Sequence, residues 1–222
     1  MDQTPVHEQH NPDLLKYIPA ESKKIIEVGC SSGALAREFK KISADCRWLG
    51  IEIDSTYTEL AKRYCDECMT LDIETATSEF WDQTKNADCW IFGDTLEHLK
   101  DPWSILKQIR STIATTGSVV TCIPNVQHWS IQARLSIGDF RYEKSGLLDQ
   151  THLRWFSRQT MIEMFNKTGF HVESGMPRIF NEPNREVFLP IIEQMAMAAG
   201  ADPKIAVADA LPLQYVIRAV PH

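Results

Sequence analysis

The stretch IIEVGCSSG at residues 25–33 constrains the fold of this chain more than any other segment. Two isoleucines lead to an acid and then to a turn bounded by Gly29 and Gly33, and the helix-forming run ALAREFKK follows at once. This order predicts a buried strand, a tight loop and the beginning of a helix. Because glycine carries no side chain, the backbone of such a loop can approach a ligand closely.

The residues of the loop argue against two common ligands. A phosphate-binding loop would end in Gly-Lys-Ser/Thr, whereas this one ends in Gly-Ala-Leu. A dinucleotide fingerprint would read G-x-G-x-x-G, whereas this one reads G-x-x-x-G. The carboxylate of Glu27 at the strand end also repels phosphate, and it suits a ligand that carries an amine or another cation.

Composition narrows the class of protein further. A chain of 222 residues fits one α/β domain, and a net charge of −7 without long Lys/Arg runs makes nucleic acid an unexpected partner. No stretch approaches the ~20 apolar residues of a membrane span, and the polar N-terminus does not resemble a signal peptide. The cysteines lie in apolar contexts that suit reduced thiols, so we expect a cytoplasmic protein. Cys65 and Cys68 form a C-x-x-C without a second ligand pair, and we interpret them as half-buried thiols at a helix end.

Apolar runs alternate with helical patterns along most of the chain. Strands are predicted at 24–28, 48–53, 67–71, 87–92, 117–123, from 170 and at 213–220, with helices at 14–18, 34–41, 55–65, 102–111, 158–168 and 189–199. This alternation predicts an α/β fold, a doubly wound and mostly parallel seven-stranded sheet. We expect one domain over residues 1–222, with an N-terminal arm at 1–18. Residues 125–157 break the alternation and predict a lid insertion on the substrate side.

Acids recur where the predicted strands end. Glu27, Glu52, Asp72 and Asp94 follow four consecutive strands, and ligands bind at the carboxyl ends of such strands. These carboxylates suit hydroxyls, an amine and a sulfonium better than a pyrophosphate. Asp54 is interpreted as a helix N-cap, and a solvated loop acid remains the alternative for Asp72.

Five blocks in order, IIEVGCSSG, LGIEID, TLDIE, ADCWIFGDTLEHLKDPW and GSVVTCIPNV, resemble the class I S-adenosylmethionine (SAM) methyltransferases over nearly the whole chain. The resemblance implies a Rossmann-like methyltransferase fold, with SAM as cofactor and S-adenosylhomocysteine (SAH) as product. PNVQHWS followed by GLLDQTHLRWFS resembles a bacterial subgroup associated with sugar and polysaccharide modification, distantly similar to the MetW and UbiG types.

The resemblance also implies roles for individual residues. Glu52 would take both ribose hydroxyls, Ile53 and Ile73 would lie beside adenine, and Asp72 would accept from the adenine amino group. Glu27, Gly29 and Asp94 would lie near the methionine part. The full implied cofactor set is Glu27, Gly29, Cys30, Ser31, Gly33, Glu52, Ile53, Asp72, Ile73 and Asp94. The family's usual central loop glycine is Ser31 here, so its side chain could narrow the approach to methionine.

Methyl transfer to a hydroxyl requires alignment of the acceptor and removal of its proton. The catalytic candidates are His152, His98 and Asp94, with His152 first because it lies in the lid motif THLRWF. For His98 the alternative is a structural tie between its helical turn and a neighbouring loop. The insertion also supplies the candidate substrate-binding residues His128, Trp129, Arg134, Arg141, Tyr142, Arg154 and Trp155. Its three arginines suit an anionic acceptor such as a nucleotide sugar or a phosphorylated glycan.

We therefore predict transfer of a methyl group from SAM to a hydroxyl of a small-molecule or carbohydrate acceptor, with no metal. One alternative is a cation held by Asp94, Glu97, His98 and His152, because small-RNA 3′-end methyltransferases use a similar E-x-x-E-H motif with a distal histidine for magnesium. That would make the protein a metal-dependent RNA 3′-end methyltransferase. The other alternative is a non-catalytic SAM-binding regulatory protein. The sequence does not indicate an oligomeric state.

Overall fold

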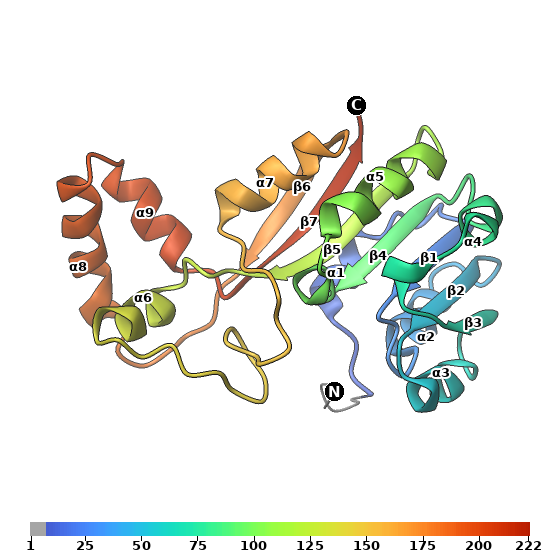
Figure 1. Ribbon diagram of the computed structural model, residues 1–222, viewed down its shortest axis with the longest axis horizontal. Helices are drawn as coiled ribbons and strands as arrows, with labels where there is room; N and C mark the ends of the chain where they lie inside the picture. The colour runs from blue at the N-terminus through green and yellow to red at the C-terminus, as the bar shows by residue number, and fades with distance from the viewer. Residues whose placement is uncertain (1–7) are drawn as a thin grey trace.

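A seven-stranded mixed sheet forms the centre of the molecule (Figure 1). The strands of this computed structural model, which describes residues 8–222, are β1 (Lys24–Val28), β2 (Arg47–Glu52), β3 (Glu67–Thr70), β4 (Cys89–Gly93), β5 (Ser118–Pro124), β6 (Phe170–Arg178) and β7 (Gln214–Pro221). Their order is β3-β2-β1-β4-β5-β7-β6. β1 to β5 pair in parallel, and β7 is antiparallel to both β5 and β6. The predicted doubly wound, mostly parallel sheet is confirmed.

Helices cover both faces of this sheet. Ile25 on β1 packs toward α1, α2 and α3, and the next residue, Ile26, packs toward α4, α5 and α7. Strands buried on both faces are apolar throughout, which is why the predicted strands lacked a polar alternation. The helices are α1 (Pro12–Tyr17), α2 (Ala34–Phe39), α3 (Ser55–Ala61), α4 (Ser78–Gln83), α5 (Pro102–Thr112) and α7 (Arg158–Lys167), with short 3-10 helices η1 (Ile73–Thr75) and η2 (Leu96–His98).

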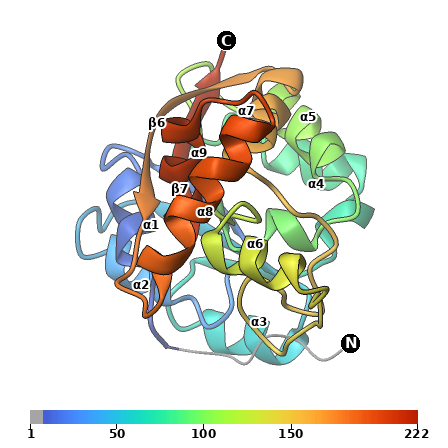
Figure 2. The same cartoon turned by 90° about the vertical axis from the view of Figure 1, so that its left-hand side faces the viewer.

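A separate group of helices lies beyond the sheet (Figures 1 and 2). It consists of α6 (Trp129–Ser136), α8 (Arg185–Ala198) and α9 (Pro203–Ala210). Trp129 stacks on Phe188 with ring centroids 5.4 Å apart, and Ile192 and Ala210 are buried beside them. The first part of the predicted insertion therefore packs against the C-terminal helices, and residues 137–157 continue as a long loop.

The predicted elements agree with the structure except in the insertion and near the C-terminus, because α6 lies where no helix was predicted. α8 begins four residues before the predicted helix at 189–199, and α9 was not predicted. The start of α9 is nevertheless encoded locally, because Asp202 accepts from the backbone N–H groups of Lys204 and Ile205. Pro203 occupies its first turn.

Part of the predicted N-terminal arm is docked on the sheet. Residues 1–7 lie outside the described residues. In α1, Leu14 is buried, and Asp13 forms an ion pair with Arg178 of β6 at 3.2 Å. Asn11 caps this helix by accepting from the N–H groups of Asp13 and Leu14. The arm thus brings residues 8–11 to the edge of the sheet where the strands end.

The cysteines are all free, and Cys68 is more exposed than Cys65, in line with the interpretation of the C-x-x-C as partly buried thiols. Within residues 8–222, none of the helices has the length and apolar character that a membrane span requires.

Candidate functional site

A cavity of about 1200 Å³ opens at the carboxyl ends of the parallel strands. The glycine loop after β1, the ends of β2 and β3, the N-terminal arm and the loop at 145–153 all contribute to its wall. Its lining includes most of the expected cofactor residues, namely Glu27, Gly29, Cys30, Ser31, Glu52, Ile53, Asp72, Ile73 and Asp94. Gly33 does not line it. The catalytic candidates His98 and His152 line the same cavity as Asp94.

The backbone conformation of the glycine loop explains why glycine occurs at two of its positions. Gly29 and Gly33 both have φ of 76°, in the left-handed region that glycine tolerates best. A Cβ on Gly29 would lie 2.6 Å from Oγ1 of Thr95, so the loop passes close to the segment after β4. A Cβ on Gly33 would lie 3.2 Å from the backbone of Ala61, so Gly33 lets α2 approach α3. Ser31 has φ of 48°, the conformation that the glycine usual at this position would adopt without strain.

Glu52 connects the end of β2 to this loop. Its carboxylate accepts from the backbone N–H of Ser31 at 2.9 Å and from that of Ile53 at 2.8 Å. The side chain is only 5% exposed, yet it lines the cavity. Three features therefore fix this carboxylate: burial and two backbone donors. Asp54 accepts from Thr56 N–H at 2.7 Å and caps α3, which confirms the predicted N-cap.

Asp72 and Ile73 follow β3, the strand that pairs with β2. Asp72 is half-buried and accepts from the N–H of Glu74 at 3.0 Å, so it caps η1. Ile73 is buried, whereas Ile53 is 59% exposed and lines the cavity. An exposed isoleucine at a cavity wall presents an apolar surface that a flat ring could cover.

Glu27 is a buried acid at the base of the cavity. It is 5% exposed, and the indole N–H of Trp48 donates to its carboxylate at 3.0 Å. Burial raises the pKa of this carboxyl well above its ordinary range, and the nearby Cys65 adds to the shift. A cationic ligand group near Glu27 would favour the ionised form again.

Asp94 follows β4 with an unusual backbone conformation. Its φ is 53°, and its N–H donates to the carbonyl of Cys122 on β5 at 3.1 Å. Its carboxylate accepts from the side-chain amide of Gln214, at the start of β7. Gln214 also lines the cavity, although no motif in the sequence predicts a role for it.

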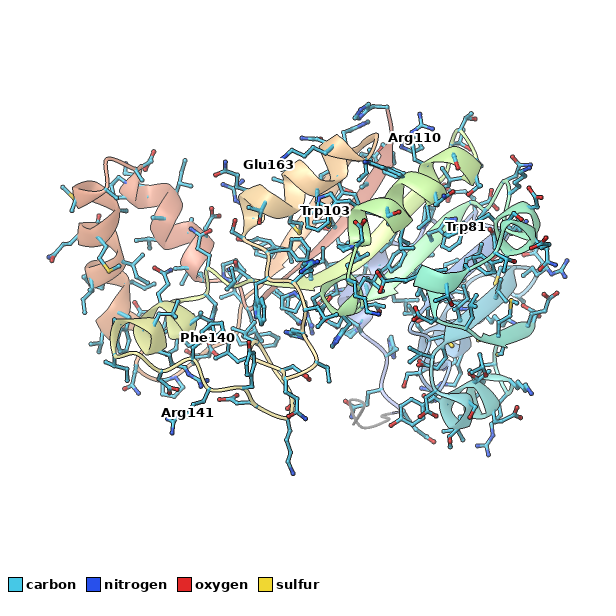
Figure 3. The ribbon with its side chains drawn as sticks, viewed as in Figure 1. Trp81, Trp103, Arg110, Phe140, Arg141 and Glu163 are labelled. Atoms are coloured by element: carbon cyan, nitrogen blue, oxygen red, sulfur yellow. The ribbon has the colours of Figure 1, made fainter. Side chains whose placement is uncertain are left out.

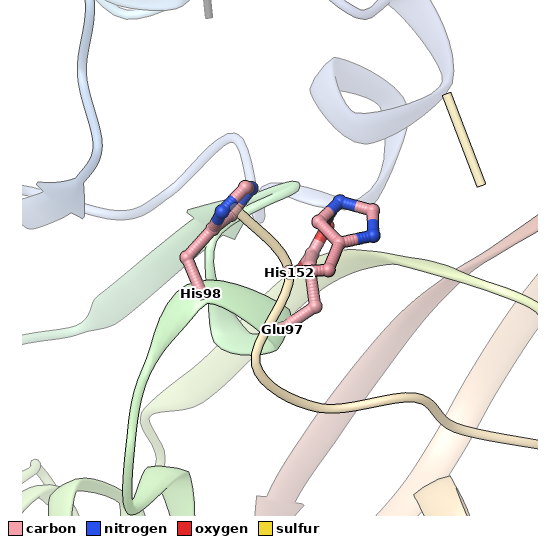
Figure 4. Close-up of side chains that lie close together, drawn as sticks. All are labelled: Glu97, His98 and His152. Atoms are coloured by element: carbon pink, nitrogen blue, oxygen red, sulfur yellow. Dashed lines mark ion pairs between the residues drawn. The ribbon is translucent and has the colours of Figure 1, made fainter. Parts of the chain in front are cut away.

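Glu97, His98 and His152 form a compact cluster at the other end of the cavity (Figure 4). The two imidazole rings have centroids 4.8 Å apart, and Nε2 of His152 lies 3.9 Å from Oε1 of Glu97. Within the described part of the chain, neither carboxylate oxygen of Glu97 has a hydrogen-bond partner, although the residue is only 1% exposed. A buried carboxylate without a partner is costly unless a ligand satisfies it.

The protonation of this cluster follows from burial. Burial raises the pKa of Glu97 well above its ordinary range, and the charge of Asp94 adds to the shift. Burial also lowers the pKa of His98 and of His152. Both imidazoles are therefore neutral near pH 7, and a neutral imidazole can accept a proton.

The long loop at residues 137–157, predicted as part of a lid, reaches this cluster through backbone and side-chain bonds. The N–H groups of Leu153 and Arg154 donate to the backbone carbonyl of Glu97 at 2.8 and 2.9 Å. Nδ1 of His98 lies 3.1 Å from the hydroxyl of Thr151, which donates to Asp149 at 2.6 Å. His98 thus connects η2 to this loop, a contact that the structural alternative for His98 also expects. His152 keeps Nε2 directed toward Glu97, because its Nδ1 lies 3.3 Å from the carbonyl of Leu147.

Comparison with known proteins decides the family. Residues 7–174 match the family model described as a methyltransferase domain, which is more than half of the chain. The chain belongs to this methyltransferase family. SAM is the methyl donor of the family, so the predicted cofactor agrees with the membership.

Individual relatives agree with this assignment. The ubiquinone biosynthesis O-methyltransferase of Histophilus somni (strain 2336) is 30% identical over 128 residues, covering 52% of this chain and 52% of the relative. The chain spans about half the length of the curated relatives it matches. A putative SAM-dependent methyltransferase from Listeria monocytogenes has a TM-score of 0.60 at 16% identity, with 94% and 96% of the two chains covered. Magnesium protoporphyrin IX methyltransferase from Synechocystis PCC 6803, solved with SAH, has a TM-score of 0.58 at 11% identity, covering 92% of this chain and 76% of that chain.

The methyltransferase cavity does not include the residues that the sequence analysis selected for acceptor binding. None of His128, Trp129, Arg134, Arg141, Tyr142, Arg154 and Trp155 lines it. The lid instead contributes Ser145, Gly146, Leu147, Asp149, Gln150, Thr151, His152 and Leu153. All of these residues except Ser145 belong to the motif GLLDQTHL. The small and aliphatic members of this motif have no chemical pattern that distinguishes them from an ordinary loop.

The selected residues have structural partners inside the insertion. Arg134 pairs with Asp139 and Glu143. Arg141, which lies near Phe140 (Figure 3), pairs with Asp139. Arg154 donates to the backbone carbonyl of Lys100. The arginines therefore neutralise acids or bind a carbonyl of the methyltransferase itself, and they do not form an anion site in the cavity.

The selected aromatic residues contact protein side chains outside the cavity, although Tyr142 is exposed. His128 is fully buried, with Nε2 3.0 Å from Glu182 and Nδ1 2.8 Å from the hydroxyl of Ser130. Trp129 packs against α8, as described above. Tyr142 and Trp155 form a ring cluster with Phe140, with centroid distances of 5.9 to 6.2 Å. This cluster connects two parts of the loop, on either side of the cavity-lining residues.

Proposed function

We propose that this methyltransferase transfers the methyl group of SAM to a hydroxyl of an uncharged small molecule. The observation that carries the proposal is one continuous cavity with a different chemistry at each end. Glu52 and Asp72 stand at the end formed by β2 and β3, and Glu97 and His152 stand at the lid end. The first end suits a nucleoside, and the second suits a group that must lose a proton.

The cofactor would lie across the carboxyl ends of β1 to β4. Glu52 would accept from the ribose hydroxyls, and the adenine would lie between Ile53 and Ile73, with its amino group toward Asp72. Burial of the exposed Ile53 side chain by the ring would add apolar contact of the kind that stabilises nucleotide complexes. The methionine part would follow the Gly29–Ser31 backbone toward Glu27 and Asp94, whose carboxylates suit its amino group.

The acceptor would enter from the lid end, with its hydroxyl near His152. In the reaction, the acceptor oxygen forms a bond with the methyl carbon while the carbon–sulfur bond breaks, and SAH leaves. The hydroxyl proton passes to Nε2 of the neutral His152. His98 would position His152 and the lid through Thr151, and Asp94 would remain near the cofactor amine.

Charge supports an uncharged acceptor over the anionic one expected from sequence. The lid end of the cavity presents the acids Asp94 and Asp149, against Lys100 as a lining cation. A phosphate or carboxylate placed there would meet like charges. Phenols and sugar hydroxyls carry no such charge, and the relative from Histophilus somni is named as an O-methyltransferase. The free cysteines favour a reducing compartment such as the cytoplasm.

A second candidate function adds a divalent cation to the same chemistry. One ligand atom each from Glu97, His98 and His152 lies within 4.8 Å of the others, and the Glu97 oxygens lack hydrogen-bond partners among residues 8–222. Asp94, the fourth member of the expected set, is bonded to Gln214 and lies outside this group. Metal analysis after chelator-free purification tests the idea, and full activity of a metal-free, EDTA-treated protein would rule the cation out.

The experiment for the main proposal measures SAH release from SAM with a panel of phenols and methyl glycosides. We expect turnover on an uncharged hydroxyl compound, and less turnover on its phosphorylated counterpart. SAH binding without turnover on any panel compound would instead support the non-catalytic regulatory alternative. Preference for the phosphorylated counterpart would contradict the uncharged acceptor.

A further inference from the structure

Three thiols lie close together at the glycine loop. Cys30 belongs to the loop, Cys65 follows α3, and Cys68 lies on β3. A Cβ built on Gly50 of β2 would lie 2.8 Å from the sulfur of Cys30 and 3.1 Å from that of Cys65. Gly50 therefore leaves room for both sulfur atoms at one point of the sheet, and the two thiols share a hydrogen bond.

The thiols of this group differ in reactivity. Hydrogen bonds from Cys30 and from Cys68 lower the pKa of Cys65, against the effect of its burial. Burial raises the pKa of Cys68 to about 12, and the hydrogen bond to Cys65 and burial hold the pKa of Cys30 far above its ordinary value. Cys65 is thus the thiol of the group that loses its proton most readily, and a thiolate is the form that attacks an oxidant.

A small oxidant has a route to the pair. Cys30 is only 3% exposed, but it lines the large cavity. Cys65 is 7% exposed and is not among the cavity-lining residues, and Cys68 is half-buried. An empty cavity therefore exposes the Cys30 side of the pair, whereas a ligand in the cavity would cover it.

We propose that Cys30 and Cys65 are a thiol-oxidation site, in which hydrogen peroxide converts the pair to a disulfide that distorts the glycine loop. The sulfur of Cys65 attacks one peroxide oxygen, the O–O bond breaks, and water and a sulfenic acid result. The thiol of Cys30 then attacks that sulfur, an S–S bond forms, and a second water leaves. The two thiols lose two electrons in total, and the peroxide gains them.

The disulfide would change the loop because of where Cys30 sits. A disulfide brings its sulfur atoms to about 2.05 Å, much closer than two hydrogen-bonded thiols. The N–H of Cys30 donates to Ile51 at 3.2 Å, and that of the next residue, Ser31, donates to Glu52 at 2.9 Å. Pulling Cys30 toward Cys65 disturbs both bonds, so oxidation weakens cofactor binding. This consequence rests on the proposed cofactor site at Glu52.

The first measurement maps the disulfide. The full chain is treated with hydrogen peroxide with and without saturating SAH, free thiols are alkylated, and peptides are sequenced by mass spectrometry. We expect a Cys30–Cys65 link that dithiothreitol reverses and that SAH slows. A Cys65–Cys68 link, or alkylation of both Cys30 and Cys65 after peroxide, would overturn the proposal.

The second measurement is the affinity for SAH by calorimetry before and after oxidation. We expect a loss of at least about fivefold in the oxidised protein, the scale of one hydrogen bond, with recovery after reduction. Cys68→Ser should keep this loss, and Cys65→Ser should abolish it. If the disulfide-linked and reduced proteins bind SAH with equal affinity, the proposed effect of the disulfide on the glycine loop is wrong. Failure of the reduced protein to bind SAH would instead overturn the proposed function, while the mapped link would still decide the oxidation site.

Discussion

The backbone N–H of Ser31 donates to the carboxylate of Glu52 at 2.9 Å, which joins the glycine loop after β1 to the end of β2. Gly29 and Cys30 add to this junction, because both N–H groups donate to the carbonyl of Ile51. The residue proposed to hold the ribose therefore also fixes the loop proposed to hold methionine. Changes at Glu52 are expected to affect both parts of the cofactor site.

Glu52→Ala should weaken SAH binding by about 1–3 kcal/mol, the range for losing hydrogen bonds to a charged group. Calorimetry with the purified protein measures the change. Glu59→Ala is a matched control, because Glu59 is exposed on α3 and pairs with Lys62. Unchanged affinity of the Glu52 variant would refute the proposed cofactor position.

His152→Ala should leave SAH binding intact and lower turnover by about 10²–10⁴-fold, the contribution of a positioned general base. Steady-state kinetics and calorimetry on the same preparation separate the two effects. His171→Ala serves as the control, since His171 is an exposed residue of β6 outside the cavity lining. Normal turnover of the His152 variant would assign this histidine a structural role.

Gly29→Ala should destabilise the fold more than Gly138→Ala. Both positions have positive φ, of 76° and 74°, so an alanine costs about 1–2 kcal/mol at each from backbone conformation alone. The added methyl meets Thr95 at 2.6 Å in the first case and nothing within 4 Å in the second. Urea denaturation measures both free energies of unfolding, and equal losses would show that the contact with Thr95 relaxes freely.

Arg141→Ala should change the acceptor KM by less than about twofold, because exposed ion pairs contribute little. The side chain is 87% exposed and pairs with Asp139, outside the cavity. Gln150→Ala, which alters a cavity-lining residue, should raise that KM more. A large KM increase for the Arg141 variant alone would restore an acceptor site on the outer part of the lid.

Strand ends were predictable from sequence, and the lid was not. In β1 to β4, apolar runs end on acids, so the position of Glu27, Glu52 and Asp94 at one edge follows from parallel strand pairing alone. The lid has no such periodicity. An arginine has the same sequence pattern whether it binds a ligand or pairs with a neighbouring acid, as Arg134 does with Asp139.

The cluster of Glu97, His98 and His152 was also only partly predictable from the sequence. Glu97 and His98 could be placed together from their adjacency, but the approach of His152 depends on the path of the whole loop. Its approach is set by backbone bonds from Leu153 and Arg154 to Glu97, which no side-chain pattern encodes. Helix α6 was missed as a partner of α8 because Trp129 and Phe188 are far apart in sequence.

A crystal structure of the protein with SAH bound tests the central claim most directly. We predict that both ribose hydroxyls lie within hydrogen-bond distance of Glu52, that the adenine contacts Ile53 and Ile73, and that the sulfur atom faces the Glu97–His152 end of the cavity. SAH bound elsewhere, or with its sulfur directed away from His152, would contradict the account.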